Sequence, residues 1–219
     1  MLILSLLSSG CSSTGSVAGA SAGRSNTETT VVHSPAKNGS SSIKVESNGA
    51  YGFTLSEVVR INADVRRDYQ RAVLLLQAGQ LEDGIKLLES IVERAPDVTN
   101  PHIDLGIAYV RVGRFAEAEA SLAAALVLAP NHLAALNELG ILQRRAGRFE
   151  EARASYQQAL IIHPGFHFAL LNLGMLCDLY LQDLSCALEN YTRYEAIVPD
   201  DPDIRIWIAD VRDRMAVGG

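Results

Sequence analysis

A 34-residue pattern, present in four copies, constrains this chain more than any other feature of its sequence. The clearest copy spans 99–132, and its marked positions are Leu105, Gly106, Tyr109, Gly113, Ala118, Leu122, Ala125 and Pro130. Prolines at 96, 130, 164 and 199 close the copies, at spacings of 34, 34 and 35 residues. A repeat of this length is a small structural unit that buries its apolar face by stacking on its neighbours. The copies are predicted at about 65–98, 99–132, 133–166 and 167–201.

Each copy predicts two amphipathic helices joined by a tight turn. Apolar residues at helical spacing lie on both sides of Gly113, and Pro130 lacks the N–H that would continue the second helix. Gly106 on the first helix and Ala118 on the second are small enough to let the two helices touch. We therefore expect one helical hairpin per copy.

The period, the small residues and the closing proline together resemble the tetratricopeptide repeat (TPR) family. The resemblance implies an all-α, right-handed solenoid of about four helix-turn-helix repeats. A run at 202–216 begins with acidic residues and a proline and then shows one apolar face, so we expect a helix that caps the last repeat. The TPR domain is expected over 53–216. Its first helix is predicted to run unbroken over 55–77, with Thr54 or Ser56 as the N-cap.

The N-terminus resembles a bacterial lipoprotein signal peptide over residues 1–10. The residues Leu7, Ser8, Ser9 and Gly10 precede Cys11, which the resemblance implies is lipidated. Ser12 in place of aspartate implies sorting to the outer membrane. The apolar run is short and no Lys or Arg precedes it, so we interpret the signal as truncated. The alternative is a hydrophobic N-terminus with a free cysteine.

Residues 11–52 are rich in Ser, Gly, Thr and Asn and contain few large apolar residues. Such a composition cannot bury a core, and we expect a lipidated, disordered tether. Two short apolar pairs stand out, Val31 with Val32 and Ile43 with Val45. They would form a strand if a partner supplied an edge, but disorder is the favoured interpretation.

Charge and motif patterns argue against several classes of function. The 219 residues carry a net charge of −6 with no basic block, which disfavours nucleic-acid binding. His163 and His167 are four residues apart, but Pro164 interrupts the helix that would place both on one face. With no phosphate loop, nucleophile elbow or HExxH motif, we expect no enzyme, no cofactor and no metal site.

Cys177 and Cys186 fall on the two helices of the last hairpin. In an oxidising compartment they are a possible disulfide, because lipidation of Cys11 would leave them as the remaining pair. Cys186 adjoins the crossing residue Ala187, whereas Cys177 lies nearer the turn. Their Cα atoms are therefore expected to be too far apart for a bridge, and two buried thiols are favoured.

The TPR resemblance also implies a binding surface, because the first helices of TPR hairpins line a concave groove. The residues at groove positions are Tyr69, Val73, Ile103, Ile107, Asn137, Ile141, Phe168, Leu171, Asn172 and Met175. The sixth positions, Gln70, Asp104, Glu138 and Asn172, include no Lys or Arg. They depart from the basic clamp with which chaperone-binding TPR domains hold a carboxylate. The alternative for the apolar row is burial by neighbouring helices or self-association.

These features together predict a non-enzymatic scaffold or assembly factor, anchored in the outer membrane by its lipid and facing the periplasm. Its groove would hold a helical or extended segment of another envelope protein. The systems that such lipoproteins serve include pili, secretins, outer-membrane proteins, peptidoglycan machinery and TonB/ExbB-type energy transduction. The alternatives are a regulatory or specificity subunit of an envelope enzyme, and a self-associating structural protein that forms homo-oligomers.

Overall fold

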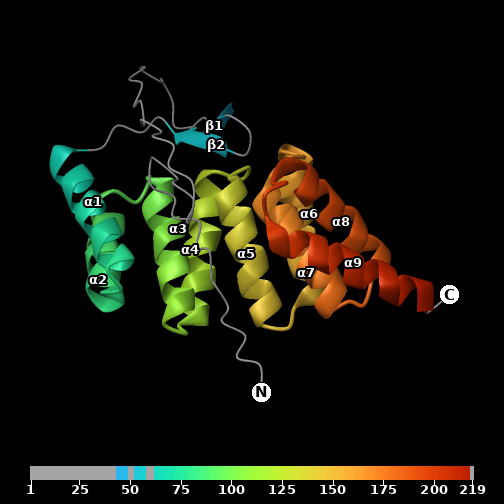
Figure 1. Cartoon of the computed structure of the whole chain (residues 1–219). Coiled ribbons are helices and arrows are strands. Elements are labelled where there is room, and N and C mark those ends of the chain that lie inside the picture. The colour runs from blue at the N-terminus through green and yellow to red at the C-terminus, as the bar shows by residue number, and fades with distance from the viewer. Residues whose placement is uncertain (1–42, 49–51, 58–61, 218–219) are drawn as a thin grey trace.

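The computed structural model describes residues 43–48, 52–57 and 62–217 (Figure 1). The proposed signal peptide at 1–10, Cys11, and the predicted tether up to residue 42 lie outside the described residues. Among the described helices, none combines the length and the apolar character needed to cross a bilayer.

The part of the chain from 62 to 217 consists of four helical pairs followed by a single helix (Figure 1). The pairs are α1 (Ala63–Gln77) with α2 (Leu81–Arg94), α3 (Thr99–Arg111) with α4 (Phe115–Leu128), α5 (Leu133–Arg145) with α6 (Phe149–Ile162), and α7 (His167–Leu179) with α8 (Leu184–Ile197). The last helix is α9 (Pro202–Val217). Each pair packs on the next, with α2 against α3, α4 against α5, α6 against α7 and α8 against α9. This arrangement confirms the predicted all-α TPR solenoid.

The turn between the two helices of every pair contains a residue in the left-handed conformation. Gly79, Gly113 and Gly147 have φ angles of +79°, +80° and +76°. Open space surrounds all three, so their conformation and not crowding calls for glycine. The fourth turn is one residue longer, and there Gln182 takes the left-handed conformation with φ at +54°.

The two helices of a pair come closest at a glycine. A Cβ atom on Gly106 would lie 2.6 Å from Leu122 Cγ, and one on Gly140 would lie 2.5 Å from Tyr156 Cε1. The sequence indicated Ala118 as the residue facing Gly106. In the structure Ala118 contributes its backbone oxygen at 3.4 Å, while the side chain of Leu122, one turn later, fills the space. The contact is therefore glycine against a large side chain.

The apolar core is continuous along the stack. One cluster extends from α1 to α5 and includes Leu88 and Leu122, and a second extends from α5 to α9 and includes Tyr156 and Tyr191. Leu126 packs against both clusters. Helix α9 closes the second cluster with three buried residues, Ile204, Ile208 and Val211.

The predicted helix over 55–77 is wrong in its first part. Helix α1 begins only at Ala63, and its N-cap is Asn62, whose Oδ1 accepts a hydrogen bond of 3.0 Å from the Asp64 N–H. The segment before it forms strand β2 (Gly52–Glu57), which pairs antiparallel with β1 (Ile43–Asn48). The prediction of disorder is therefore also wrong for 43–48. Each segment supplies the edge that the other needed to form a strand.

The close approach at Gly140 generates a stability test. Gly140→Leu should lower the free energy of unfolding by about 1–3 kcal/mol or more, because the new side chain must displace the buried ring of Tyr156. Ala154→Leu adds the same side chain at an exposed site of α6 and should unfold close to the parent. Chemical denaturation followed by circular dichroism measures both. Equal stability of the two variants would contradict the assigned packing.

Candidate functional site

The first helices of the pairs, α1, α3, α5 and α7, are neighbours in space, each in contact with the next. We call the surface that they form the first-helix face. The residues predicted to line a groove all lie on these four helices. The ones that are partly buried are Tyr69, Ile107, Ile141, Phe168, Leu171, Asn172 and Met175. Their role in binding stays a prediction.

Three of the predicted groove residues are buried. Ile103 has no exposed surface and belongs to the core cluster of α1–α5, while Val73 is 8% and Asn137 is 2% exposed. Ile103 and Asn137 occupy equivalent positions, 34 residues apart. The expectation that they are free to meet a ligand is wrong, because this position is buried in both repeats. Their substitution would affect folding directly.

Polar side chains link the first helices to one another. The Tyr69 hydroxyl donates a hydrogen bond of 2.5 Å to Asp104 Oδ2, joining α1 to α3. Asn172 Nδ2 donates to Asn137 Oδ1 at 3.0 Å, joining α7 to α5. Both pairs are 35 residues apart, which is one repeat plus one position. The sequence analysis named these side chains but did not pair them, although the spacing was visible.

Glu138 is a buried acid of this face. It is 6% exposed, and burial raises the pKa of its carboxyl to about 7. A hydrogen bond of 3.4 Å from Asn137 Nδ2 and the charge of Arg145 lower this pKa, while the charge of Asp104 raises it. Near neutral pH the carboxyl is therefore poised between its charged and neutral forms.

An apolar row runs beside these polar links. Ile107, Ile141 and Met175 stand 34 residues apart, and each is partly buried against a core cluster. The row offers aliphatic surface, and Asn172 beside it carries an amide. Such a surface suits the apolar side chains and backbone of another polypeptide.

The two cysteines of the last hairpin form a disulfide. The Cα atoms of Cys177 and Cys186 are 5.8 Å apart, so the prediction that they would be too distant is wrong. Cys177 lies in the last turn of α7 and Cys186 in the first turn of α8, which places both next to the connection between the helices. The sequence analysis had placed Cys186 too far along its helix.

The fold and this surface define an all-α solenoid of repeated helical pairs. Residues 103–165 match the sequence profile of the tetratricopeptide repeat. The match identifies the helical pairs of 103–165 as tetratricopeptide repeats. Among proteins of curated function, none matches this sequence.

Several solved structures share the fold. MamA 41-end from Desulfovibrio magneticus RS-1 aligns with a TM-score of 0.63 and 17% identity over 72% of this chain and 88% of its own. Pseudomonas aeruginosa PilF aligns at 0.63 with 21% identity, over 70% of each chain. TTC0263, a thermophilic TPR protein of Thermus thermophilus, aligns at 0.61 with 23% identity over 68% of this chain and 81% of its own. At these identities the likeness shows the fold. TPR folds serve as protein–protein interaction scaffolds and are generally non-enzymatic.

Burial of Glu138 generates a pH-dependent prediction. Burial raises the pKa of this carboxyl in the folded state above its value in the unfolded state. The carboxyl therefore contributes most to stability at low pH, where it is neutral in both states, and this contribution is lost as pH rises through about 7. Glu138→Gln cannot ionise and avoids this loss. Between pH 4.5 and 7 the variant should gain up to about 3 kcal/mol relative to the parent, measured by urea unfolding.

The comparison must be a difference between variants at each pH. Burial lowers the pKa values of His132 and His167 to about 4, so their contribution to stability rises with pH over a similar range. Subtracting the parent removes this contribution. Glu150→Gln, at an exposed site of α6, is the matched control and should differ from the parent by the same amount at every pH. A difference for Glu138→Gln that does not change with pH would show that this carboxyl is solvated.

Proposed function

We propose that this chain is a non-enzymatic scaffold whose first-helix face holds a helical or extended segment of another cell-envelope protein. The observation that carries the proposal is the row of Ile107, Ile141 and Met175, which is repeated once per hairpin and only partly buried. A segment that lies across α3, α5 and α7 would cover all three residues at once. Burial of aliphatic surface at such a contact supplies the main part of the binding free energy.

The polar groups of the face favour particular ligand chemistry. Asp104 and Glu138 stand at equivalent positions of α3 and α5, where a carboxylate-binding TPR groove would carry basic side chains. Their acidity disfavours a ligand held by its C-terminal carboxylate. The amide of the partly buried Asn172 instead suits the backbone of a bound segment, because an amide both donates and accepts hydrogen bonds.

The proposed location rests on the N-terminal sequence. The lipobox-like residues before Cys11 support an acylated cysteine, and Ser12 supports sorting to the outer membrane. The Ser/Gly-rich composition that follows supports a tether between the lipid and the repeats. On this proposal the helical domain works in the periplasm, within reach of the membrane surface.

The binding proposal is tested by Ile107→Gln combined with Ile141→Gln. Gln keeps a good helix former at two partly exposed positions and removes the aliphatic surface. Each lost anchor should cost on the order of 1–3 kcal/mol of binding, or roughly a fivefold to hundredfold fall in affinity. The measurement is capture of partners from envelope extract by the tagged full chain, with affinity then determined for the main partner.

The matched control is Val127→Gln combined with Ile161→Gln. These residues are also 34 residues apart, but they lie on the second helices α4 and α6 and are 81% and 73% exposed. This variant should retain the partner that the first-helix variant loses. Circular dichroism and the melting temperature must match the parent in both variants. If the folded first-helix variant keeps its partner, this face is a packing surface and the proposal is wrong.

The anchor is tested separately by metabolic labelling with a palmitate analogue. Label should appear on the parent and be absent from Cys11→Ser, and it should fractionate with the outer membrane. The expressed gene must include any upstream start codon. Unlabelled parent protein would contradict the lipid anchor and leave the binding proposal intact.

A further inference from the structure

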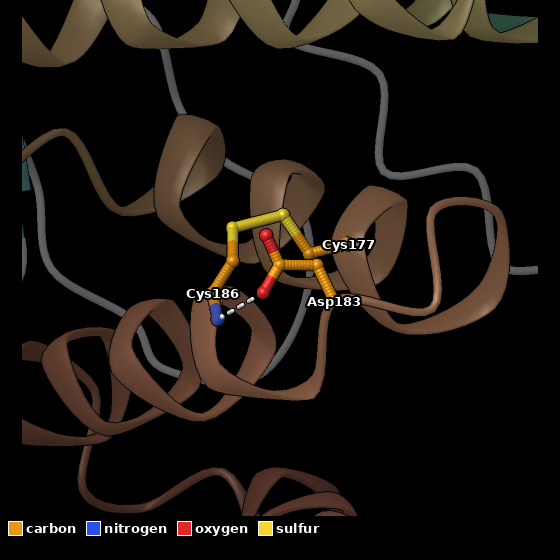
Figure 2. A group of neighbouring side chains, drawn as sticks. All are labelled: Cys177, Asp183 and Cys186. Atoms are coloured by element: carbon orange, nitrogen blue, oxygen red, sulfur yellow. Dashed lines mark hydrogen bonds between the residues drawn. A yellow bond between two sulfur atoms is a disulfide. The ribbon is translucent and has the colours of Figure 1, made fainter.

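A compact group of potential metal ligands lies at the turn between α7 and α8 (Figure 2). Cys177 lies in the last turn of α7, Asp183 is the N-cap of α8, and Cys186 lies in its first turn. The two sulfur atoms and a carboxylate oxygen of Asp183 all lie within 4.8 Å of one another. Within the described residues no other group of three His, Cys, Asp or Glu side chains meets this condition. The sequence analysis considered a metal only at His163 and His167 and missed this group.

We propose that the reduced form of this hairpin binds a divalent cation of borderline softness, Zn²⁺ above all, through Cys177, Asp183 and Cys186. Two thiolates and one carboxylate are ligands that zinc takes at about 2.0–2.3 Å, and a water molecule would complete a tetrahedron. The disulfide is then the metal-free, oxidised state of the same site. Neither the TPR fold nor the proposed binding face requires this site.

The backbone holds the three ligands in place. The Asp183 N–H donates to the Cys177 carbonyl at 2.9 Å, which ties the connection back to the end of α7. The Cys186 N–H donates to Asp183 Oδ1 at 3.0 Å, which orients the carboxylate toward the sulfurs (Figure 2). Two thiolates bound to one zinc ion stand about 3.8 Å apart. We expect rotation of the partly exposed Cys186 side chain to move its sulfur to this separation once the disulfide is reduced.

Neighbouring polar groups bear on the charge of the reduced site. Arg153 on α6 donates to Asp183 Oδ2 at 2.8 Å and approaches Cys177 Sγ at 3.8 Å. Asn190 Nδ2 lies 3.6 Å from Cys186 Sγ, and the Oδ1 atom of this buried amide has no hydrogen-bond partner. The guanidinium stabilises thiolates when no metal is bound, but it competes with a cation for Asp183. Removal of Arg153 should therefore tighten metal binding, which a purely structural disulfide would not predict.

The redox and metal steps balance as follows. A phosphine and one water reduce the disulfide to two thiols and leave the phosphine oxide. Zn²⁺ then replaces the two thiol protons, which are released. A small disulfide oxidant returns the site to its first state by taking up two protons, and it yields the Cys177–Cys186 bond, two small thiols and free Zn²⁺. Oxidation thus expels the metal.

The test uses the full chain in a Cys11→Ser background, so that the two hairpin cysteines supply all the thiols. The protein is reduced with a phosphine, freed of reductant without air, and titrated with Co²⁺ and then Zn²⁺. We expect one equivalent of Co²⁺ to produce a thiolate-to-cobalt charge-transfer band, with release of two protons, and Zn²⁺ to abolish the band. The oxidised protein should give no band.

Three variants distinguish the site from chance binding by thiols. Asp183→Asn keeps a good N-cap but removes the charged ligand, and it should weaken cobalt binding roughly tenfold or more. Arg153→Gln should strengthen binding severalfold. Glu189→Gln, an exposed change on the same helix, should leave it unaltered.

Two results would overturn the proposal. One is a reduced chain that stays helical and gives no charge-transfer band. The other is binding of equal strength in the parent, Asp183→Asn and Arg153→Gln, which would mean that the thiols act without the surrounding site. A reduced chain that loses helicity and regains it with one equivalent of cobalt would support the proposal, provided that Asp183→Asn weakens this effect.

Discussion

The close approach of two helices at a glycine is the contact on which the rest of this structure depends. At Gly140 and Gly174 the hairpin places an aromatic ring directly against the backbone, and at Gly106 it places a leucine there. Each pair is therefore narrow enough for its second helix to reach the next pair. Because each helical pair packs mainly on its neighbours along the stack, a single widened hairpin would disturb the interfaces on both of its sides.

Stacking also determines what the first helices can offer to a partner. Positions between adjacent first helices are used for packing, as the burial of Ile103 and Asn137 shows. Positions one turn further along, such as Ile107 and Ile141, keep part of their surface exposed. The first-helix face thus combines buried residues that hold the stack together with residues that a partner can reach. The two kinds of position lie one helical turn apart on the same helix.

The last hairpin departs from the others, and its special features meet at one turn. One additional residue lengthens the connection, and Gln182 takes the place of the usual glycine. The longer connection leads into Asp183, which caps α8, and the cysteines lie on either side of it. Three potential ligands thus lie at the one within-pair connection that is longer than the others.

Sequence alone determined the repeat, because period, turn glycines and closing prolines are local signals that recur in phase. It also determined which residues lie on the first helices. Tertiary structure decided which of them are buried, since burial of Ile103 depends on a helix one repeat away. It likewise decided that 52–57 pairs as a strand, that the cysteines are within bonding distance, and that Glu138 is hard to ionise. Each of these depends on distances between segments that no local pattern records.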